Sequence, residues 1–217
     1  GRPNGFLSRR SEIWRDTDGD RTGMLPRAFE AGFGYEAYTD WLLDMPMYFV
    51  KRGETYHDVS GASFRDLMDG RLAALPGERA TMSDWANHAS TAFPEVRLKR
   101  YIEMRGSDVG GADMIVAQAA FWVGLLYDDA GLAAAWDIAK AWSTAERECL
   151  RAIVPRLGLA TPIAGRSLGT VAAEALAIAR KGLEARGRRD AQGRDETHFL
   201  QPLEAIVASG HSRAEDR

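Results

Sequence analysis

The stretch from Pro94 to Gly106, P-E-V-R-L-K-R-Y-I-E-M-R-G, limits the fold most, because apolar and polar side chains alternate along it. Such alternation is typical of a β-strand, in which successive side chains point to opposite faces of a sheet. We therefore expect one strand over 95–105. Its first face carries four apolar side chains, which are Val96, Leu98, Ile102 and Met104. Its second face carries Arg97, Lys99, Tyr101, Glu103 and Arg105.

The polar face of this strand has two interpretations. In the first, it is the solvated outer face of a sheet whose apolar face covers the core, and the pattern alone favours this view slightly. In the second, it is a nucleotide site. Glu103 would then bind a hard divalent cation, and Arg105, two residues further along the same face, would reach phosphate oxygens. Composition does not decide between the two interpretations.

The chain changes character near residue 106. Before it, we expect a short strand near Ser8–Trp14, a helix over 35–43 and a β-like run over 47–51. After it, helices are expected over most of the chain, one of them opened by the capping signal Ser143-Thr144-Ala145-Glu146 and stopped at Pro155. The sequence therefore predicts an α+β fold, in which part of an antiparallel β-sheet within 1–106 is followed by a mainly helical region over 107–217.

The global numbers exclude several classes of protein. The chain has 217 residues, enough for one domain with a sizeable core, and a net charge of −3. A general nucleic-acid binder is usually basic, so nucleic acid is not an expected partner. No apolar run approaches the length that crosses a membrane, so no membrane partner is expected either. Cys149 is the single cysteine, which excludes an intrachain disulfide and fits a reducing, cytoplasmic location.

Short motifs add little to this picture. The aspartates Asp16, Asp18 and Asp20 alternate as in a calcium loop, but the glycine and glutamate that an EF-hand requires are replaced by Arg21 and Arg27. The sequence contains no P-loop motif, and its four histidines are scattered without the spacing of a zinc site. A nucleotide would therefore have to be held by other means.

Longer words of the sequence carry more information. They are G-R-P-N-G-F-L-S-R-R-S-E-I-W at 1–14, D-T-D-G-D-R-T-G-M-L-P at 16–26, M-P-M-Y-F-V at 45–50, F-P-E-V-R-L-K-R-Y-I-E-M-R-G at 93–106 and F-W-V-G-L-L-Y-D at 121–128. In this order the chain resembles the C-terminal half of glutamate–cysteine ligases of the plant and proteobacterial type, and the match weakens after about residue 155. The resemblance implies a glutamine-synthetase-like carboxylate–amine ligase fold, with 1–217 forming the C-terminal portion of one catalytic domain.

The resemblance also implies an activity and site residues. The activity is ATP- and Mg²⁺-dependent ligation of glutamate, through its γ-carboxylate, to cysteine, which is the first step of glutathione synthesis. Arg10 matches the arginine that binds the substrate α-carboxylate, and Trp14 lies near it. Tyr48 matches a tyrosine of the cysteine pocket. Glu103 is then the metal ligand, while Arg105 acts on the transferring phosphate and binds ATP together with Lys99.

Each assignment has a plainer alternative. Arg10 and Trp14, four residues apart, are compatible with a cation stacked on an indole at the surface, and Tyr48 with a half-buried tyrosine on a sheet. The chain also departs from the family at 109–114, where V-G-G-A-D-M stands in place of G-G-P-W-R-R. Two rival functions therefore remain: a ligase of the same fold with another substrate pair, and an inactive fragment or interaction domain without the N-terminal half.

Overall fold

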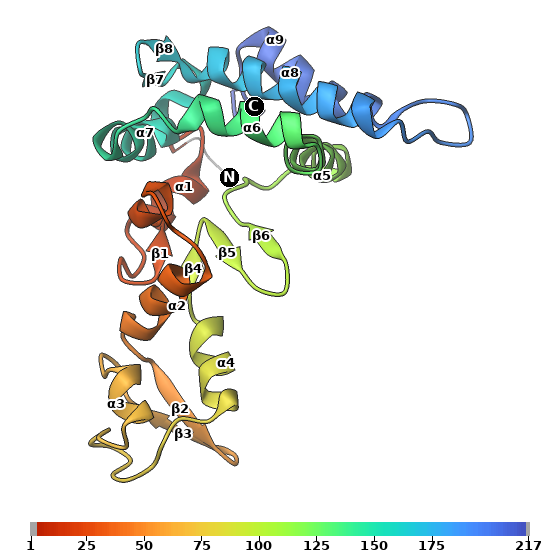
Figure 1. Ribbon diagram of the computed structural model, residues 1–217. Helices are drawn as coiled ribbons and strands as arrows, with labels where there is room; N and C mark the ends of the chain where they lie inside the picture. The colour runs from red at the N-terminus through yellow and green to blue at the C-terminus, as the bar shows by residue number, and fades with distance from the viewer. Residues whose placement is uncertain (1–3, 216–217) are drawn as a thin grey trace. The chain divides into compact units, whose positions relative to one another are not determined.

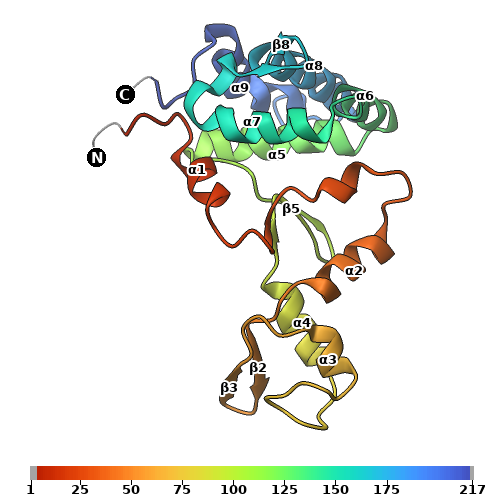
Figure 2. The same ribbon diagram turned by 90° about the vertical axis from the view of Figure 1, so that its left-hand side faces the viewer.

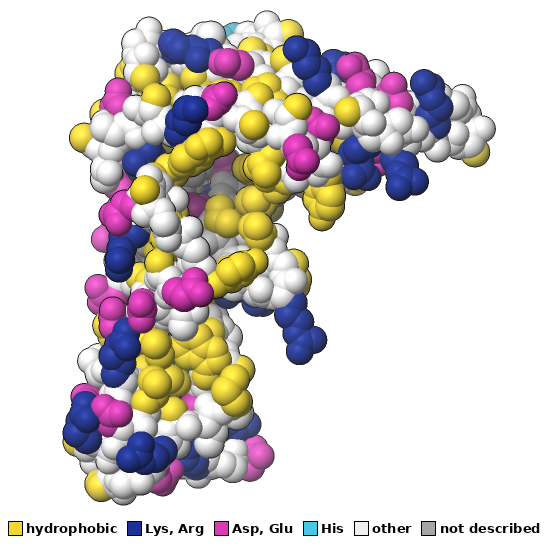
Figure 3. Space-filling view, in the orientation of Figure 1, with side chains coloured by type: hydrophobic (Ala, Val, Ile, Leu, Met, Phe, Trp, Pro, Cys, Tyr) yellow, Lys and Arg dark blue, Asp and Glu magenta, His cyan; other side chains and the backbone are white. Residues whose placement is uncertain are grey.

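The computed structural model describes residues 4–215, and the chain divides into two compact units. The first, called here the mixed unit, is Trp14–Ser107. The second, called here the helical unit, joins the residues up to Ile13 with those from Asp108 onward. The two units have separate hydrophobic clusters, and acidic and basic side chains are interspersed on the surface of both (Figure 3).

The mixed unit combines short helices with pairs of short strands (Figure 1). Its elements are β1 (Thr22–Gly23), η1 (Pro26–Phe29), α2 (Tyr35–Asp44), β2 (Phe49–Arg52), β3 (Thr55–Asp58), α3 (Phe64–Met68), α4 (Met82–Ser90), β4 (Phe93–Pro94), β5 (Val96–Leu98) and β6 (Ile102–Met104). Strands β2 and β3 form an antiparallel hairpin, as do β5 and β6, whereas β1 pairs in parallel with β4. The expected helix over 35–43 and strand over 47–51 are thus both present, but the strand begins two residues later and ends one residue later than expected.

Two apolar clusters hold the mixed unit together. One lies between the β2–β3 hairpin and α3, which Figure 2 shows close together, and contains Met47, Val50, Phe64 and Leu67. The other lies against α2 and contains Tyr38, Leu42, Met45 and Ala92. Helix α4 connects them, because its Trp85 packs against both clusters. Its first turn is fixed by a capping box, in which Thr81 and Asp84 satisfy each other's backbone N–H groups.

The expectation of one continuous strand over 95–105 is wrong, because residues 99–101 form a bend and the stretch folds into the β5–β6 hairpin. Arg97 pairs with Glu103 and Leu98 with Ile102, so the two sets of side chains still occupy opposite faces. Their burial departs from the expectation in part. On the polar face Arg97 is only 8% exposed and Glu103 and Arg105 are half-buried, although Lys99 and Tyr101 are exposed. On the apolar face Val96 and Ile102 are 48% and 57% exposed, whereas Leu98 and Met104 are half-buried.

The expected strand near Ser8–Trp14 is a helix instead, α1 (Arg9–Arg15). It begins where the Ser8 hydroxyl accepts from the backbone N–H of Ser11, at 3.1 Å. Arg10 and Trp14 are separated by four residues, which puts them on one side of a helix as well as of a strand. The four-residue spacing therefore predicted correctly that the two residues share one side of their element, although the element is a helix and not a strand.

The helical unit is built around one long helix, α8 (Leu168–Arg186), which packs against α5 (Ala112–Leu126), α6 (Asp129–Ala139) and α9 (Gln201–Ser209) (Figures 1 and 2). Its other elements are α7 (Thr144–Leu157), η2 (Gly158–Ala160), β7 (Pro162–Ile163), β8 (Arg166–Ser167) and η3 (Glu196–Leu200). The capping box at Ser143 and Glu146 is present as expected. The expected stop at Pro155 is wrong, since α7 continues to Leu157 and the ring lies in its last turns at the cost of one backbone hydrogen bond.

Helices α5 and α8 approach each other closely because glycines lie where they meet. A methyl group added at Gly124 would come 2.1 Å from the carbonyl oxygen of Ala179, and one added at Gly182 would come 1.9 Å from the carbonyl oxygen of Gly124. Around this crossing lie the buried side chains of Leu125, Leu176 and others of the same cluster.

Taken over both units, the chain is a mixed helix-and-strand protein, as the α+β expectation stated.

Candidate active site

The polar face of the β5–β6 hairpin brings three of the expected site residues together. Arg105 lies over two aromatic rings of the mixed unit, with its Cζ atom 5.9 Å from the centroid of Trp14 and 5.4 Å from that of Phe93. The two rings are themselves in contact, with centroids 6.2 Å apart. Glu103 completes the group, because its Oε1 lies 3.3 Å from a terminal nitrogen of Arg105. We call these residues, with Arg97, the hairpin cluster.

Glu103 is held from both sides by cations. Arg97 donates through Nε to its Oε2 at 2.7 Å, opposite the contact with Arg105. The pKa of Glu103 is lowered, first by the hydrogen bond from Arg97 and then by the charges of Arg97, Arg105 and Lys99. The carboxylate is therefore ionised at neutral pH and engaged with two guanidinium groups.

The hairpin cluster offers one carboxylate, that of Glu103, to a divalent cation. Among the residues that the structure describes, no group of three or more His, Cys, Asp or Glu side chains is arranged to hold a metal ion. Magnesium usually requires six oxygen ligands in near-octahedral geometry. Most of these ligands are usually waters and substrate phosphates, with one or two protein carboxylates among them, so Glu103 would supply one ligand of such a site.

Tyr48 belongs to a second group, which we call the Arg21 cluster. Its phenol donates a hydrogen bond to Asp18 Oδ2, and the Arg21 guanidinium covers its ring with the Cζ atom 3.4 Å from the centroid. The hydrogen bond between the two side chains lowers the pKa of Asp18 and raises the pKa of Tyr48. Tyr48 immediately precedes β2, and its carbonyl oxygen accepts from Val59 N–H at 3.0 Å, which fixes the backbone as well.

The two clusters share the chain segment from Thr91 to Phe93, between α4 and β5. Arg21 donates to the Thr91 hydroxyl at 2.9 Å, and the Phe93 N–H donates to the Arg21 carbonyl oxygen at 2.7 Å. Arg97 donates to the Ala92 carbonyl oxygen at 3.0 Å from the other side. Tyr48 and Arg105 are thus positioned by one common piece of backbone, although they are 57 residues apart in the numbering.

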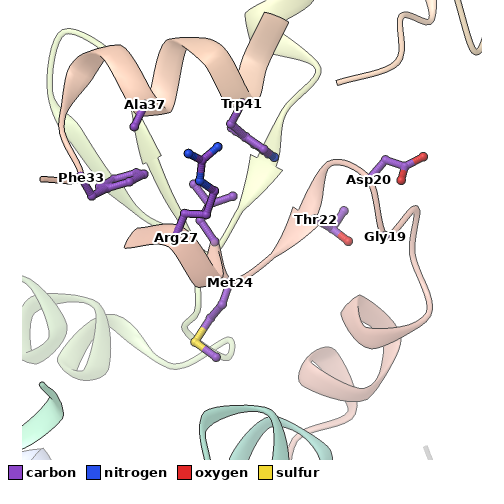
Figure 4. A pocket seen from close by; sticks show the side chains of 9 residues that line it. Gly19, Asp20, Thr22, Met24, Arg27, Phe33, Ala37 and Trp41 are labelled. Atoms are coloured by element: carbon purple, nitrogen blue, oxygen red, sulfur yellow. The ribbon is translucent and has the colours of Figure 1, made fainter. Parts of the chain in front are cut away.

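An open pocket of about 150 Å³ lies beside the Asp-rich loop of the mixed unit. Figure 4 shows Arg27 directed between Phe33 and Trp41, with Ala37 behind, and Asp20 and Thr22 on another edge. The wall formed by Gly19, Asp20 and Thr22 is the same loop that carries Asp18 and Arg21. Its lining is mostly apolar, with a cation at one side and a carboxylate at the other.

The remaining expected site residues lie elsewhere. Lys99 is exposed in the bend of the β5–β6 hairpin, with its Nζ 5.9 Å from the centroid of Tyr101. Arg10 is half-buried on α1, one turn before Trp14. The alternative of an indole stacked on a cation is realised at Trp14, but the cation is Arg105.

Sequence reasoning missed the two most buried cations of these clusters. Arg97 was placed on a polar face without a separate role, yet it pairs with Glu103 and also caps the end of α4 by donating to the Ser90 carbonyl oxygen at 3.2 Å. Arg21 was noted only as a residue that spoils a calcium loop, yet it is 2% exposed. No local pattern distinguishes a buried arginine from an exposed one, because its partners come from distant segments.

Comparison with known proteins gives a consistent result. A sequence model of glutamate–cysteine ligase family 2 matches residues 1–217. The chain is 49% identical over 215 residues to the chloroplastic glutamate–cysteine ligase A of Oryza sativa subsp. indica, and 51% identical over 215 residues to the chloroplastic glutamate–cysteine ligase of Arabidopsis thaliana. The corresponding enzyme of Brassica juncea is 50% identical over 216 residues.

These alignments cover 99–100% of this chain but only 40–42% of the relatives, so the chain spans about two fifths of their length. The expectation of a cytoplasmic protein is contradicted, because the relatives are chloroplastic enzymes. A single cysteine does not identify a compartment, so composition alone could not support the expectation. Within the described residues, no helix is long and apolar enough to cross a membrane. The match over the full 217 residues shows that the chain belongs to glutamate–cysteine ligase family 2.

Proposed function

We propose that the complete protein joins the γ-carboxylate of L-glutamate to the amine of L-cysteine at the expense of ATP. The observation that carries this proposal is the family match over the whole chain, together with about 50% identity to plant enzymes that bear the name of this reaction. The hairpin cluster supports it, because guanidinium groups beside a carboxylate suit a reaction in which negative charge moves between oxygens.

The reaction has two balanced steps. The glutamate γ-carboxylate attacks the terminal phosphorus of ATP, which gives a γ-acyl phosphate and ADP. The cysteine amine then attacks the acyl carbon, phosphate leaves with the bonding electrons, and the amine loses a proton as the amide forms. Cations stabilise the charge on the transferring group. Magnesium with ATP is part of the proposal for the complete protein, with Glu103 as a candidate ligand.

The arginines suggest distinct roles. Arg10 is the proposed partner of the glutamate α-carboxylate, since a planar fork binds both carboxylate oxygens, and Trp14 is proposed to flank the substrate beside it. Arg105 is proposed to meet the phosphate groups: it lies over two aromatic rings, at 18% side-chain exposure, beside Glu103. Lys99 is proposed as a further phosphate partner, since the exposed hairpin bend leaves its flexible stem room to move.

Tyr48 is proposed to line the cysteine pocket from the Arg21 cluster. The complete protein is also proposed to have the carboxylate–amine ligase fold, in which the exposed side chains of Val96 and Ile102 on the β5–β6 hairpin are covered by the part of the sequence that the relatives have in addition. The supporting observation is the exposure of these two side chains, 48% and 57%. An isolated two-stranded hairpin is in general only marginally stable, so additional strands or a covering segment would stabilise it.

The test is turnover by the complete protein, measured as ADP released and as γ-glutamylcysteine formed. We expect both to depend on glutamate, cysteine and ATP together. The 217-residue chain alone is expected to give no useful turnover, because it offers one candidate metal ligand, Glu103, and spans about two fifths of the length of the relatives. Product with another amine in place of cysteine, at equal efficiency, would favour a ligase of the same fold with a different substrate pair. A complete protein without activity would favour an interaction domain.

The Arg10 assignment has its own test. In the complete protein, Arg10→Lys keeps the charge but removes the two-pronged hydrogen bond. We expect a glutamate KM raised about 10-fold or more, the effect of losing one charge-assisted hydrogen bond, and an ATP KM changed by less than about 2-fold. Arg9→Lys is the matched control, since Arg9 is exposed on the same helix with its Cζ 5.0 Å from the Phe6 ring. An unchanged glutamate KM in Arg10→Lys would contradict the assignment.

A further inference from the structure

Arg21 is among the most buried side chains of the mixed unit, although it carries a permanent charge. Only 2% of its surface is exposed. A charged group is rarely buried to this extent unless it is fully paired, because removal of the charge from water is costly. We therefore expect the buried charge of Arg21 to have a function that an apolar side chain of similar size would not perform.

The guanidinium joins three segments of the chain. Its Nε donates to Asp18 Oδ2 at 2.8 Å, one terminal nitrogen donates to the Thr91 hydroxyl at 2.9 Å, and the other donates to the Pro46 carbonyl oxygen at 2.7 Å. Asp18 belongs to the loop that precedes β1, Pro46 to the turn that precedes β2, and Thr91 to the C-terminal cap of α4. A fork of fixed geometry can satisfy three such partners at once.

The same guanidinium fixes the orientation of Tyr48. It covers one face of the phenol ring at 3.4 Å, and the phenol oxygen donates to Asp18 Oδ2, the very atom that receives Arg21 Nε. The ring is therefore restrained both at its face and at its hydroxyl. Asp18 has a backbone φ of +23°, a conformation that L residues rarely adopt and that persists only when its surroundings enforce it.

We propose that Arg21 is a positioning residue for recognition of the acceptor amino acid, which acts by clamping Asp18 and Tyr48 in one fixed arrangement. The inference rests on the proposed function, since Tyr48 is the proposed wall of the cysteine pocket. A structural role alone would require only that the three segments stay together. A positioning role requires in addition that loosening these contacts weakens the binding of the acceptor amino acid, but not the binding of glutamate or ATP.

Lysine at position 21 separates these roles. Arg21→Lys keeps the charge, but an ammonium group does not cover the Tyr48 ring as a planar group does and does not reach all three partners in the same geometry. In the complete protein we expect the cysteine KM to rise about 10-fold or more, the effect of losing one charge-assisted hydrogen bond. The KM values for glutamate and ATP should change by less than about 2-fold.

Two further variants make the test specific. Tyr48→Phe removes the phenol hydroxyl that donates to Asp18. Because both substitutions act through one contact, the double variant with Arg21→Lys should raise the cysteine KM no further than the more strongly affected single variant. Arg52→Lys is the matched control. Arg52 also bridges two acidic side chains, Glu78 at 2.6 Å and Asp84 at 2.7 Å, whereas Arg21 and Tyr48 share the partner Asp18. It should lower the melting temperature without changing the cysteine KM.

A second measurement applies if Arg21→Lys does not fold. Asp18→Asn removes the charge that the phenol faces, and an ultraviolet difference titration of the 217-residue chain against Tyr48→Phe follows the phenol itself. The pKa of Tyr48, raised in the parent chain by its bond to Asp18, should return toward its ordinary value. In the complete protein, the same substitution should raise the cysteine KM.

The outcomes separate the two proposals. An active complete protein in which Arg21→Lys or Asp18→Asn leaves the cysteine KM unchanged overturns the positioning role and leaves the proposed function intact. Equal increases in the KM for all three substrates also overturn it, since they indicate a general loss of structure. A complete wild-type protein that forms no γ-glutamylcysteine overturns both.

Discussion

Gly182→Ala should destabilise the helical unit, even though alanine is the better helix former. The added methyl group would lie 1.9 Å from the carbonyl oxygen of Gly124 on the neighbouring helix. A carbon and an oxygen that are not hydrogen-bonded require roughly 3.3 Å, so α5 and α8 would have to separate by on the order of 1 Å. A gap of that size forfeits a quarter to a half of the dispersion energy of each contact across it.

The expected magnitude follows from two opposing effects. Overpacking of a close contact costs about 1–3 kcal/mol, and more when backbone is involved. Exchange of glycine for alanine in a helix interior returns about 1 kcal/mol. Because the obstacle is a backbone oxygen and not a flexible side chain, the loss should prevail, with a net cost of about 2 kcal/mol. For a chain of this size that corresponds to a fall in Tm of roughly 4–8 °C.

Urea unfolding and thermal melting of the 217-residue chain would measure this effect. Gly124→Ala should behave similarly, because its methyl group would lie 2.1 Å from the Ala179 carbonyl oxygen. The double variant should cost less than the sum of the two, since one separation of the helices relieves both contacts. Ala177→Gly, at an exposed position of α8, calibrates the helix propensity by itself. A Gly182→Ala chain as stable as its parent, or more stable, would refute the close crossing.

Three further predictions concern the mixed unit of the 217-residue chain. Burial lowers the pKa of His88 below the 6.5 of the unfolded chain, so neutral His88 contributes fully to stability above about pH 6.5. This contribution is lost as the pH falls through the lowered pKa of the folded chain. The melting temperature should therefore fall between about pH 7.5 and 5.5, and the control variant His211→Gln should show the same fall. Glu103→Gln should cost about 1–2 kcal/mol in urea unfolding, because it leaves the buried guanidinium of Arg97 without its anionic partner; no change would show that the pair is not formed. Ile102→Asp should shift the melting temperature by less than roughly 2 °C, since the side chain is exposed, whereas Val50→Asp at a buried strand position should unfold the chain.

Local chemistry in the sequence determined where several elements begin and which family the chain belongs to. The capping box at Ser143 was predicted correctly, because a hydroxyl and a carboxylate three residues apart satisfy backbone groups of the same turn. Alternation between Val96 and Met104 grouped the side chains correctly by face. Spacing also placed Arg10 and Trp14 on one side of their element. All of these depend on contacts between neighbours in the chain.

Only the tertiary structure decided which side chains of the hairpin are covered. Alternation states that two faces differ, but not which one meets the rest of the protein. Here part of the charged face is covered, because Arg97 caps α4 and Arg105 lies over the rings of Trp14 and Phe93. These partners are fixed by the path of the chain and leave no periodic signal. The usual rule that apolar faces point inward therefore predicted Leu98, which packs against the cluster of Tyr38, but not the exposed Val96 and Ile102.

The burial of Arg21 has the same origin. Its three hydrogen-bond partners lie 3, 25 and 70 residues away in the sequence. Similarly, no sequence pattern near Gly124 predicts that Gly182 lies opposite it and allows α8 to approach α5 closely. The sequence by itself determined the family and where several elements begin, because these depend on the order of the segments that match the family and on short-range patterns. The tertiary structure decided which charges are buried and where helices touch, because those depend on atoms brought together from distant parts of the chain.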